Sequence, residues 1–374
     1  MVGVLDGAAW NQPATPTPES EVTMGSLRRS AVWLRALLLA PWLLVATASQ
    51  GGVVEDASAL QLAGNPGAAM ALLRPAAEAG DAAAQVLLGS AYAYAWAGQR
   101  DPAEAYRWYR RAAESGDVEG AYNTAVLLAA GDGVSADAAA AVDWYRRAAE
   151  QGHRSAAYNL GLLYEEGRGT AVDLAQALQW IRRAAEAGHA AAMDRIGLSY
   201  LRGEARQPRD AVQGRAWVQR AAAAGHAQAQ FRLALMLIQG VGGSVDEHEA
   251  MLWLQRAAEG GLPAAMGELG GRYLGGKGLP QDLTAAARWL TAGAERDHPR
   301  AQAMLGLMAA DGVGVPKDPV QSAVWLSLAS RHDDDLAPMR DRQLGQLDAT
   351  QRAEVQRRLQ AWQPVPLSKP IGQR

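Results

Sequence analysis

The chain has 374 residues, of which 49% are hydrophobic and 20% charged, and its formal net charge is −3. It contains no cysteine, which excludes disulfide bonds, thiolate metal sites and a cysteine nucleophile. The nearly balanced charge disfavours binding to nucleic acid or to an anionic membrane surface. A composition rich in helix-forming residues, with a single Phe, predicts an all-α protein.

The amino-terminal region has the layout of a secretory signal peptide. From Met24, three arginines precede an apolar stretch over 36–46, which runs into Ala46-Thr47-Ala48. Small residues at these positions predict cleavage after Ala48, so that no integral membrane span remains. Met24 is then a candidate for the true start, and residues 1–48 are an extension plus signal peptide. Pro41 interrupts a stretch that is short for a membrane span, and an uncleaved anchor is the alternative.

A repeat is visible in the spacing of seven of the 12 tryptophans. They recur every 36 residues, with one step of 37, which indicates a stack of repeated units. We interpret them as core residues between helices rather than as ligand-stacking residues. They are Trp108, Trp144, Trp180, Trp217, Trp253, Trp289 and Trp325.

An aspartate stands seven residues before each of these tryptophans and opens an amphipathic segment. Pro follows it in two repeats, and Glu or Gln stands three residues after it in five. This predicts a helix N-cap, often completed by a capping box. The aspartates are Asp101, Asp137, Asp173, Asp210, Asp246, Asp282 and Asp318.

Another helical segment precedes each capping Asp, with an Ala and, four residues later, a Leu or Ile on the same face. It ends at a Gly-x-Gly pair such as Gly167 and Gly169. A phosphate-binding glycine run follows a strand and leads into a helix, so this context disfavours a phosphate site. We predict tight turns with glycines in the left-handed conformation.

The Trp-containing segment closes with Gly and then a polar residue, which we expect to begin the next helix. His153, His189, His226 and His298 share this position. Because the repeat separates them along a line, they cannot converge on one zinc ion at about 2 Å, and no metal site is predicted.

The order Ala-x-x-x-Leu-Gly-x-x-Tyr-x-x-Gly-x-Gly, then Asp, Trp and Ala-Ala-Glu-x-Gly, resembles the Sel1-like repeat family, α/α relatives of the tetratricopeptide repeat. The resemblance implies a right-handed α/α superhelical solenoid with seven repeats over 82–334. A leading half repeat at 49–81 places Leu72 at the Trp position. A C-terminal capping helix is predicted over 335–363, with a start signal at Asp348, and an unstructured tail over 364–374.

Four repeats depart from the pattern, and we expect local irregularity there. The first has AYAYAWAGQR in place of the glycine turn, and the fourth has Ala205 and one extra residue after Gly203. The sixth and seventh have Asp297 and Asp333 in place of the closing Gly.

The resemblance also implies function, because Sel1-like proteins serve as adaptors and assembly scaffolds. Together with the signal peptide, it predicts a periplasmic or secreted, monomeric, non-catalytic adaptor of the bacterial cell envelope. We expect a protein partner, such as a component of an envelope or polysaccharide-export complex, on the concave face. No cofactor is implied.

Candidate contact residues are the variable positions just before the Leu of each first helix, since first helices usually line the concave side of such stacks. Tyr and Arg are favoured interface anchors. Ordinary surface filling is the competing interpretation. The candidates are Tyr122, Asn123, Tyr158, Asn159, Arg195, Phe231 and Arg232.

Two alternatives stay open. A cytosolic signalling adaptor would follow if the amino terminus were neither signal nor anchor. A hydrolase of the β-lactamase-like type is suggested by cysteine-rich relatives, but the chain lacks cysteine and the S-x-x-K, G-x-S-x-G and H-E-x-x-H motifs. The nearest approach, His248-Glu249, lacks the second His, and no catalytic residue is predicted.

Overall fold

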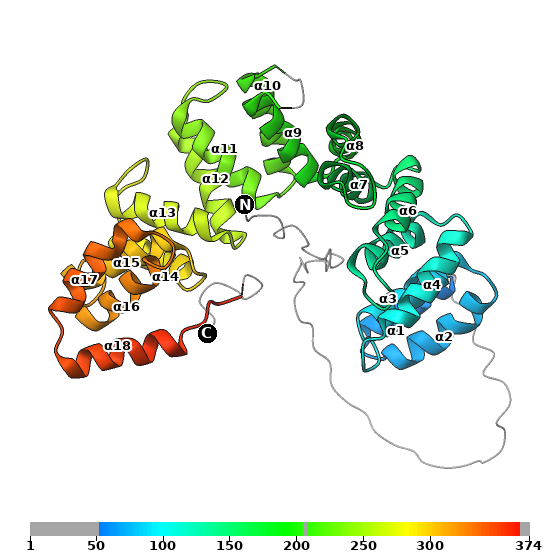
Figure 1. Cartoon of the computed structure of the whole chain (residues 1–374), viewed down its shortest axis with the longest axis horizontal. Coiled ribbons are helices and arrows are strands. Elements are labelled where there is room, and N and C mark those ends of the chain that lie inside the picture. Colours follow the sequence, from blue (N-terminus) through cyan, green and yellow to red (C-terminus); the bar gives the residue numbers. More distant parts are fainter. Residues whose placement is uncertain (1–51, 205–207, 367–374) are drawn as a thin grey trace, which may run out of the picture. The chain divides into compact units, whose positions relative to one another are not determined.

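The computed structural model describes residues 52–204 and 208–366, in which every regular element is a helix. Eighteen α-helices and one short 3-10 helix follow one another through these residues (Figure 1). Each α-helix from α1 to α16 packs on the next one along the chain, which confirms an all-α solenoid. In the described part, no helix combines the length and apolarity needed to span a bilayer. The predicted signal peptide and Ala205 lie outside the described residues.

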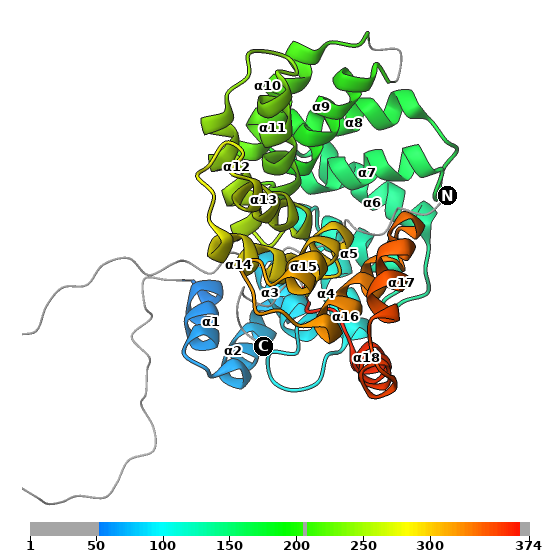
Figure 2. The same cartoon turned by 90° about the vertical axis from the view of Figure 1, so that its left-hand side faces the viewer.

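The seven repeats each contain a first and a second helix, which can be followed in chain order in Figures 1 and 2. The first helices are α3 (Ala82–Ala93), α5 (Val118–Ala130), α7 (Arg154–Glu166), α9 (Ala190–Arg202), α11 (Ala227–Gln239), α13 (Pro263–Gly275) and α15 (Pro299–Asp311). The second helices are α4 (Pro102–Glu114), α6 (Ala138–Glu150), α8 (Leu174–Glu186), α10 (Ala211–Ala223), α12 (Glu247–Glu259), α14 (Leu283–Ala294) and α16 (Pro319–Ala329).

The amino-terminal end, where a leading half repeat is predicted, forms a helix pair. Helix α1 (Val53–Leu62) packs on α2 (Pro66–Glu78) and also contacts α3. Leu72, placed at the Trp position by the alignment, is 37% exposed, whereas Leu73 is fully buried. Leu72 therefore does not take over the role of a core tryptophan.

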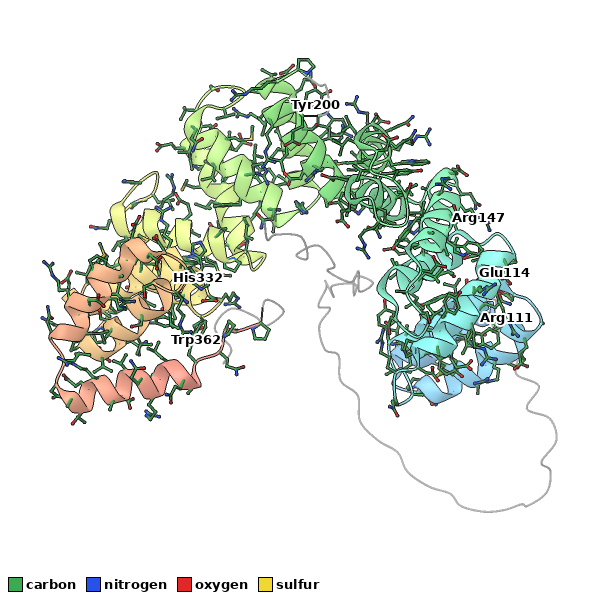
Figure 3. The ribbon with its side chains drawn as sticks, viewed as in Figure 1. Arg111, Glu114, Arg147, Tyr200, His332 and Trp362 are labelled. Carbon is green, nitrogen blue, oxygen red and sulfur yellow. The ribbon has the colours of Figure 1, made fainter. Side chains whose placement is uncertain are left out.

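The carboxy-terminal cap consists of two α-helices rather than one. After the 3-10 helix η1 (Asp334–Leu336), α17 (Ala337–Gly345) and α18 (Ala349–Ala361) both pack on α16. The break occurs where Asp348 caps α18 in a reciprocal capping box with Gln351. Trp362, labelled in Figure 3, packs half-buried against the apolar cluster of the last repeats. Of the predicted tail, the structure describes residues 364–366, where the Val365 amide donates to the Glu295 carbonyl at 2.7 Å.

The seven predicted aspartate N-caps are confirmed, since each carboxylate accepts a hydrogen bond from a backbone N–H in the first turn of its helix. The prediction that capping boxes often complete them is wrong. Three of these side chains take other partners: Glu104 accepts from Arg107, Glu249 accepts from the indole of Trp253, and Gln321 accepts from Arg358. Among the described residues, the reciprocal box occurs at Asp348 alone.

In each repeat, the residue after the tryptophan is more deeply buried than the tryptophan itself. Four of the seven tryptophans are buried, but Trp144, Trp217 and Trp253 are only half-buried. The following residue is at most 4% exposed in all seven repeats: Tyr109, Tyr145, Ile181, Val218, Leu254, Leu290 and Leu326. In five repeats it packs against a first-helix glycine. A Cβ on Gly161, for example, would lie 2.6 Å from the Ile181 side chain.

The Gly-x-Gly turns have the predicted left-handed conformation, with φ from +63° to +75°. The second glycine also has a role that the sequence pattern did not reveal. A Cβ on Gly169 would lie 2.2 Å from the carbonyl oxygen of Ala138, which begins α6 of the preceding repeat. Gly133, Gly242 and Gly314 approach the preceding second helix in the same way. These turns therefore join successive repeats by backbone contact.

Replacing Gly169 with Ala tests this inter-repeat contact. A left-handed Ala costs about 1–2 kcal/mol, and the clash with α6 should add about 1–3 kcal/mol. The free energy of unfolding, measured by denaturant titration, should fall by the sum of these two costs. Gly152→Ala is the matched control, because Gly152 has φ +92° and no heavy atom within 4 Å of its added Cβ. Equal losses in the two variants would contradict the contact.

Candidate partner-binding site

The seven candidate residues lie on four successive first helices, α5, α7, α9 and α11, and all are half-buried. Each helix contributes one or two of them at equivalent positions before its buried Leu, Ile or Thr. Six of the seven come from pairs of adjacent residues, such as Tyr158 and Asn159 on α7. The repeat therefore places them in a row, one step per first helix.

The two tyrosines contact the start of the next first helix. The Tyr122 ring stacks on His153 with centroids 4.3 Å apart and an interplanar angle of 22°. Tyr158 stacks on His189 at 4.6 Å and 25°. At the equivalent place on α13, Gly267 lies beneath His298, where an added Cβ would come within 2.5 Å of Nδ1. This position thus forms a repeating contact between neighbouring repeats.

Asn159 links α7 to α6 of the preceding repeat, because its amide Nδ2 donates to the hydroxyl of Tyr145 at 3.3 Å. Tyr145 also lies 6.0 Å from the Tyr122 ring. Burial raises the pKa of Tyr145, so this hydroxyl stays neutral. Asn159 is therefore held by the scaffold while remaining half-buried.

The two arginines pair with acidic residues of the preceding first helix. Arg195 donates to Glu165 of α7. Arg232 donates from Nε to Asp194 Oδ1 at 3.0 Å and from Nη2 to Oδ2 at 3.3 Å. Asp194 is only 8% exposed, so its charge requires this partner. These arginines are half-exposed but already neutralised.

The acidic partners were missed by reasoning from the sequence alone. A third pair of this kind joins Arg300 of α15 to Glu268 of α13 at 2.8 Å. Glu268 also accepts from Arg272 at 3.0 Å. Opposite charges separated by about one repeat in consecutive first helices were the available signal, because stacking brings such residues together.

The four repeat histidines begin helices, as predicted. In each, Nδ1 accepts the backbone N–H three residues later, at 3.0–3.3 Å. This bond requires an unprotonated Nδ1. His153 also places Nε2 3.2 Å from Glu119, and that hydrogen bond lowers the pKa of the Glu119 carboxyl. In the described residues, no group of three or more His, Asp or Glu side chains could hold a metal ion.

Burial lowers the pKa of His189 to about 4, and the nearby positive charge of Arg154 adds to this effect. Burial also lowers the pKa of His226 and His298. All three environments therefore favour the neutral imidazole that a helix N-terminus accepts, since the macrodipole disfavours a cation there.

Stability should therefore fall in acid. Between pH 6.5 and about 4, unfolded His189 binds a proton that the folded residue does not, so the free energy of unfolding decreases as pH decreases. His189→Asn keeps an N-cap acceptor without titrating. When the pH falls from 7 to 5, the free energy of unfolding of the wild type should decrease by on the order of 2 kcal/mol more than that of this variant. Chemical denaturation across this range measures the difference, and parallel curves would contradict the prediction.

Comparison with known proteins identifies the repeat. The Sel1 repeat family model matches residues 60–81, 82–117, 118–153, 154–189, 190–226, 227–262, 263–298 and 299–334. Comparison with curated proteins gives no match.

Solved structures are similar to this chain, and one of them shows the same fold. A Sel1 repeat protein from Oxalobacter formigenes is 29% identical, with a TM-score of 0.60 over 79% of this chain and 90% of that one. A protective antigen of uropathogenic Escherichia coli strains, described as displaying an SLR fold, is 26% identical. Its match covers 83% of this chain and 76% of that one, with a TM-score of 0.49.

Proposed function

Because this chain belongs to the Sel1 repeat family, we propose that it is a non-catalytic scaffold of the bacterial cell envelope that binds a protein partner along its first helices. Proteins of this family are generally protein-interaction scaffolds and generally non-catalytic. The candidate residues on α5, α7, α9 and α11 are the surface on which we place the partner.

The observation that carries this proposal is the row of half-buried side chains on these four helices, most of which are held by contacts with neighbouring side chains. Tyr122 and Tyr158 are held by stacking on histidines, and Arg195 and Arg232 are held by carboxylates. Side chains fixed in this way lose little conformational entropy when a partner binds. Tyr and Arg are also the residue types that most often dominate binding energy at interfaces.

Packing between first helices supports a concave location for this row. Helix α3 contacts α5, and α13 contacts α15, across one intervening second helix. Ion pairs join α7 to α9 and α9 to α11. Helices on the inner side of a curved stack come closest to one another, which is what we expect of first helices in this fold.

The envelope location rests on the predicted signal peptide over 24–48. When the full chain is produced in a bacterium and fractionated, the exported protein should begin at Ser49 by N-terminal sequencing and mass spectrometry. Full-length protein retained in the membrane would favour the uncleaved anchor instead. Full-length protein in the cytosol would favour the cytosolic signalling adaptor.

The binding surface is tested by affinity capture from an envelope fraction. Tagged full-length protein is compared with a Tyr158→Ala, Arg195→Ala variant. If these residues are binding hot spots, their removal should cost about 2 kcal/mol or more of binding free energy. The affinity for the partner should then be about 30-fold weaker. A partner identified by mass spectrometry can then be purified and its Kd measured for both proteins.

The control variant is Gln219→Ala, Gln255→Ala, which changes two exposed side chains on the second helices α10 and α12. Equal folding is first confirmed by circular dichroism and thermal melting. If the control loses the partner as strongly as the test variant, or if neither loses it, the first-helix assignment is wrong.

A further inference from the structure

A second row of side chains lies on the second helices, separate from the candidate residues. In α4, α6, α8, α10 and α12, an Arg three residues after the Trp stacks on its ring, with Cζ 4.0–4.9 Å from the ring centroid. We call these five residues the stacked arginines: Arg111, Arg147, Arg183, Arg220 and Arg256. Figure 3 labels Arg111 on α4 and Arg147 on α6.

The stacked arginines are exposed to solvent. Within residues 52–204 and 208–366, none of the five forms an ion pair. Neighbouring arginines on the same helices do: Arg110 Nε lies 2.8 Å from Glu114, and Arg146 Nη1 lies 2.8 Å from Asp143. The carboxylate nearest in sequence to Arg111 is thus taken by Arg110.

Stacking prepares these guanidinium groups for a ligand. A guanidinium held over an indole ring by a cation–π contact still has its N–H donors available for another partner. That planar fork matches a carboxylate in bidentate geometry. Since the Trp ring already limits the motion of the Arg side chain, less entropy is lost when a carboxylate binds.

The row is continuous and has a defined end. The five arginines occupy the same repeat position in five consecutive second helices. In α14 the stacked Arg is Arg288, which precedes Trp289 instead of following it. In α16, Leu328 takes the equivalent position. An extended ligand would therefore meet one free cation per repeat over five repeats.

Exposed glutamates alternate with this row. Four of the five stacked arginines are followed, three residues later, by an exposed Glu: Glu114, Glu150, Glu186 and Glu259. A polymer with a negative charge on every unit would meet these carboxylates and be repelled. A polypeptide can instead place acidic residues opposite the arginines and neutral or basic residues opposite the glutamates.

We propose that the stacked arginines form a second binding surface, specific for an extended polypeptide segment with spaced Asp or Glu residues. This surface is independent of the partner site on the first helices. Its charge pattern, rather than the net charge of the chain, selects the ligand.

The probe is a fluorescein-labelled synthetic peptide of 20 residues with five Asp-Gly-Ser-Gly units, binding to full-length protein by fluorescence anisotropy. The same peptide with Asn in place of Asp is the ligand control. We expect the Asp peptide to bind at least tenfold more tightly, with an affinity that falls as salt concentration rises. Equal affinity for the two peptides would overturn the proposal.

The test variant is Arg111→Gln, Arg147→Gln, and the matched control is Arg107→Gln, Arg342→Gln. Both remove two positive charges, but the control takes them from exposed arginines on α4 and α17 and leaves Glu114 paired with Arg110. We expect the Asp peptide to bind about tenfold more weakly to the test variant and less than threefold more weakly to the control. If both variants bound the Asp peptide equally weakly, net charge alone would explain the effect, and the assignment of the binding surface to the stacked arginines would be wrong.

Three further measurements distinguish a folding defect, binding at the first-helix site and a different class of ligand. If the Gln variant melts early, Arg111→Lys, Arg147→Lys keeps the charge and removes the planar fork, and it too should bind the Asp peptide more weakly than wild type. The Tyr158→Ala, Arg195→Ala variant should bind the peptide as wild type does, which separates this surface from the first-helix site. Tighter binding of inorganic polyphosphate or a DNA oligonucleotide than of the Asp peptide would overturn the choice of ligand.

Discussion

The close approach of glycines to neighbouring helices sets the geometry of this stack. Within a repeat, Gly161 leaves room for Ile181, so the two helices can pack at short range. Between repeats, Gly169 leaves room for the backbone at Ala138. A side chain at either position would push the helices apart and disturb the packing around it.

The close packing of successive repeats also determines which side chains meet on the surface of the first helices. Because successive repeats are held at a constant offset, the N-cap of one first helix meets the same position of the preceding one. That contact is a stacked Tyr-His pair at His153 and His189, and a backbone contact beneath His298. The candidate residues thus contribute to the scaffold while presenting an ordered surface, and the two interpretations offered by the sequence are compatible.

The two helices of each repeat carry different chemistry. On the first helices, the candidate arginines are neutralised in ion pairs, such as that of Arg232 with Asp194, beside aromatic and amide side chains. On the second helices, the stacked arginines are exposed and form no ion pair with any described residue. A net charge of −3 averages over both surfaces, so it cannot reveal either of them. Global charge excludes a strong overall field but not a local row of cations.

The sequence by itself determined the repeat, the all-α class, the Asp and His helix starts and the left-handed glycine turns. These features follow from local physical chemistry, since an N-cap or a positive φ needs only a few consecutive residues. Tertiary structure decided that the residue after each tryptophan is more deeply buried than the tryptophan. It further decided that position 169 needs a glycine and that Glu165 and Asp194 neutralise the candidate arginines. It also decided that Glu104 and Glu249 leave the capping box for other partners. Those outcomes depend on side chains about one repeat apart or on competition between partners, which periodicity alone does not specify.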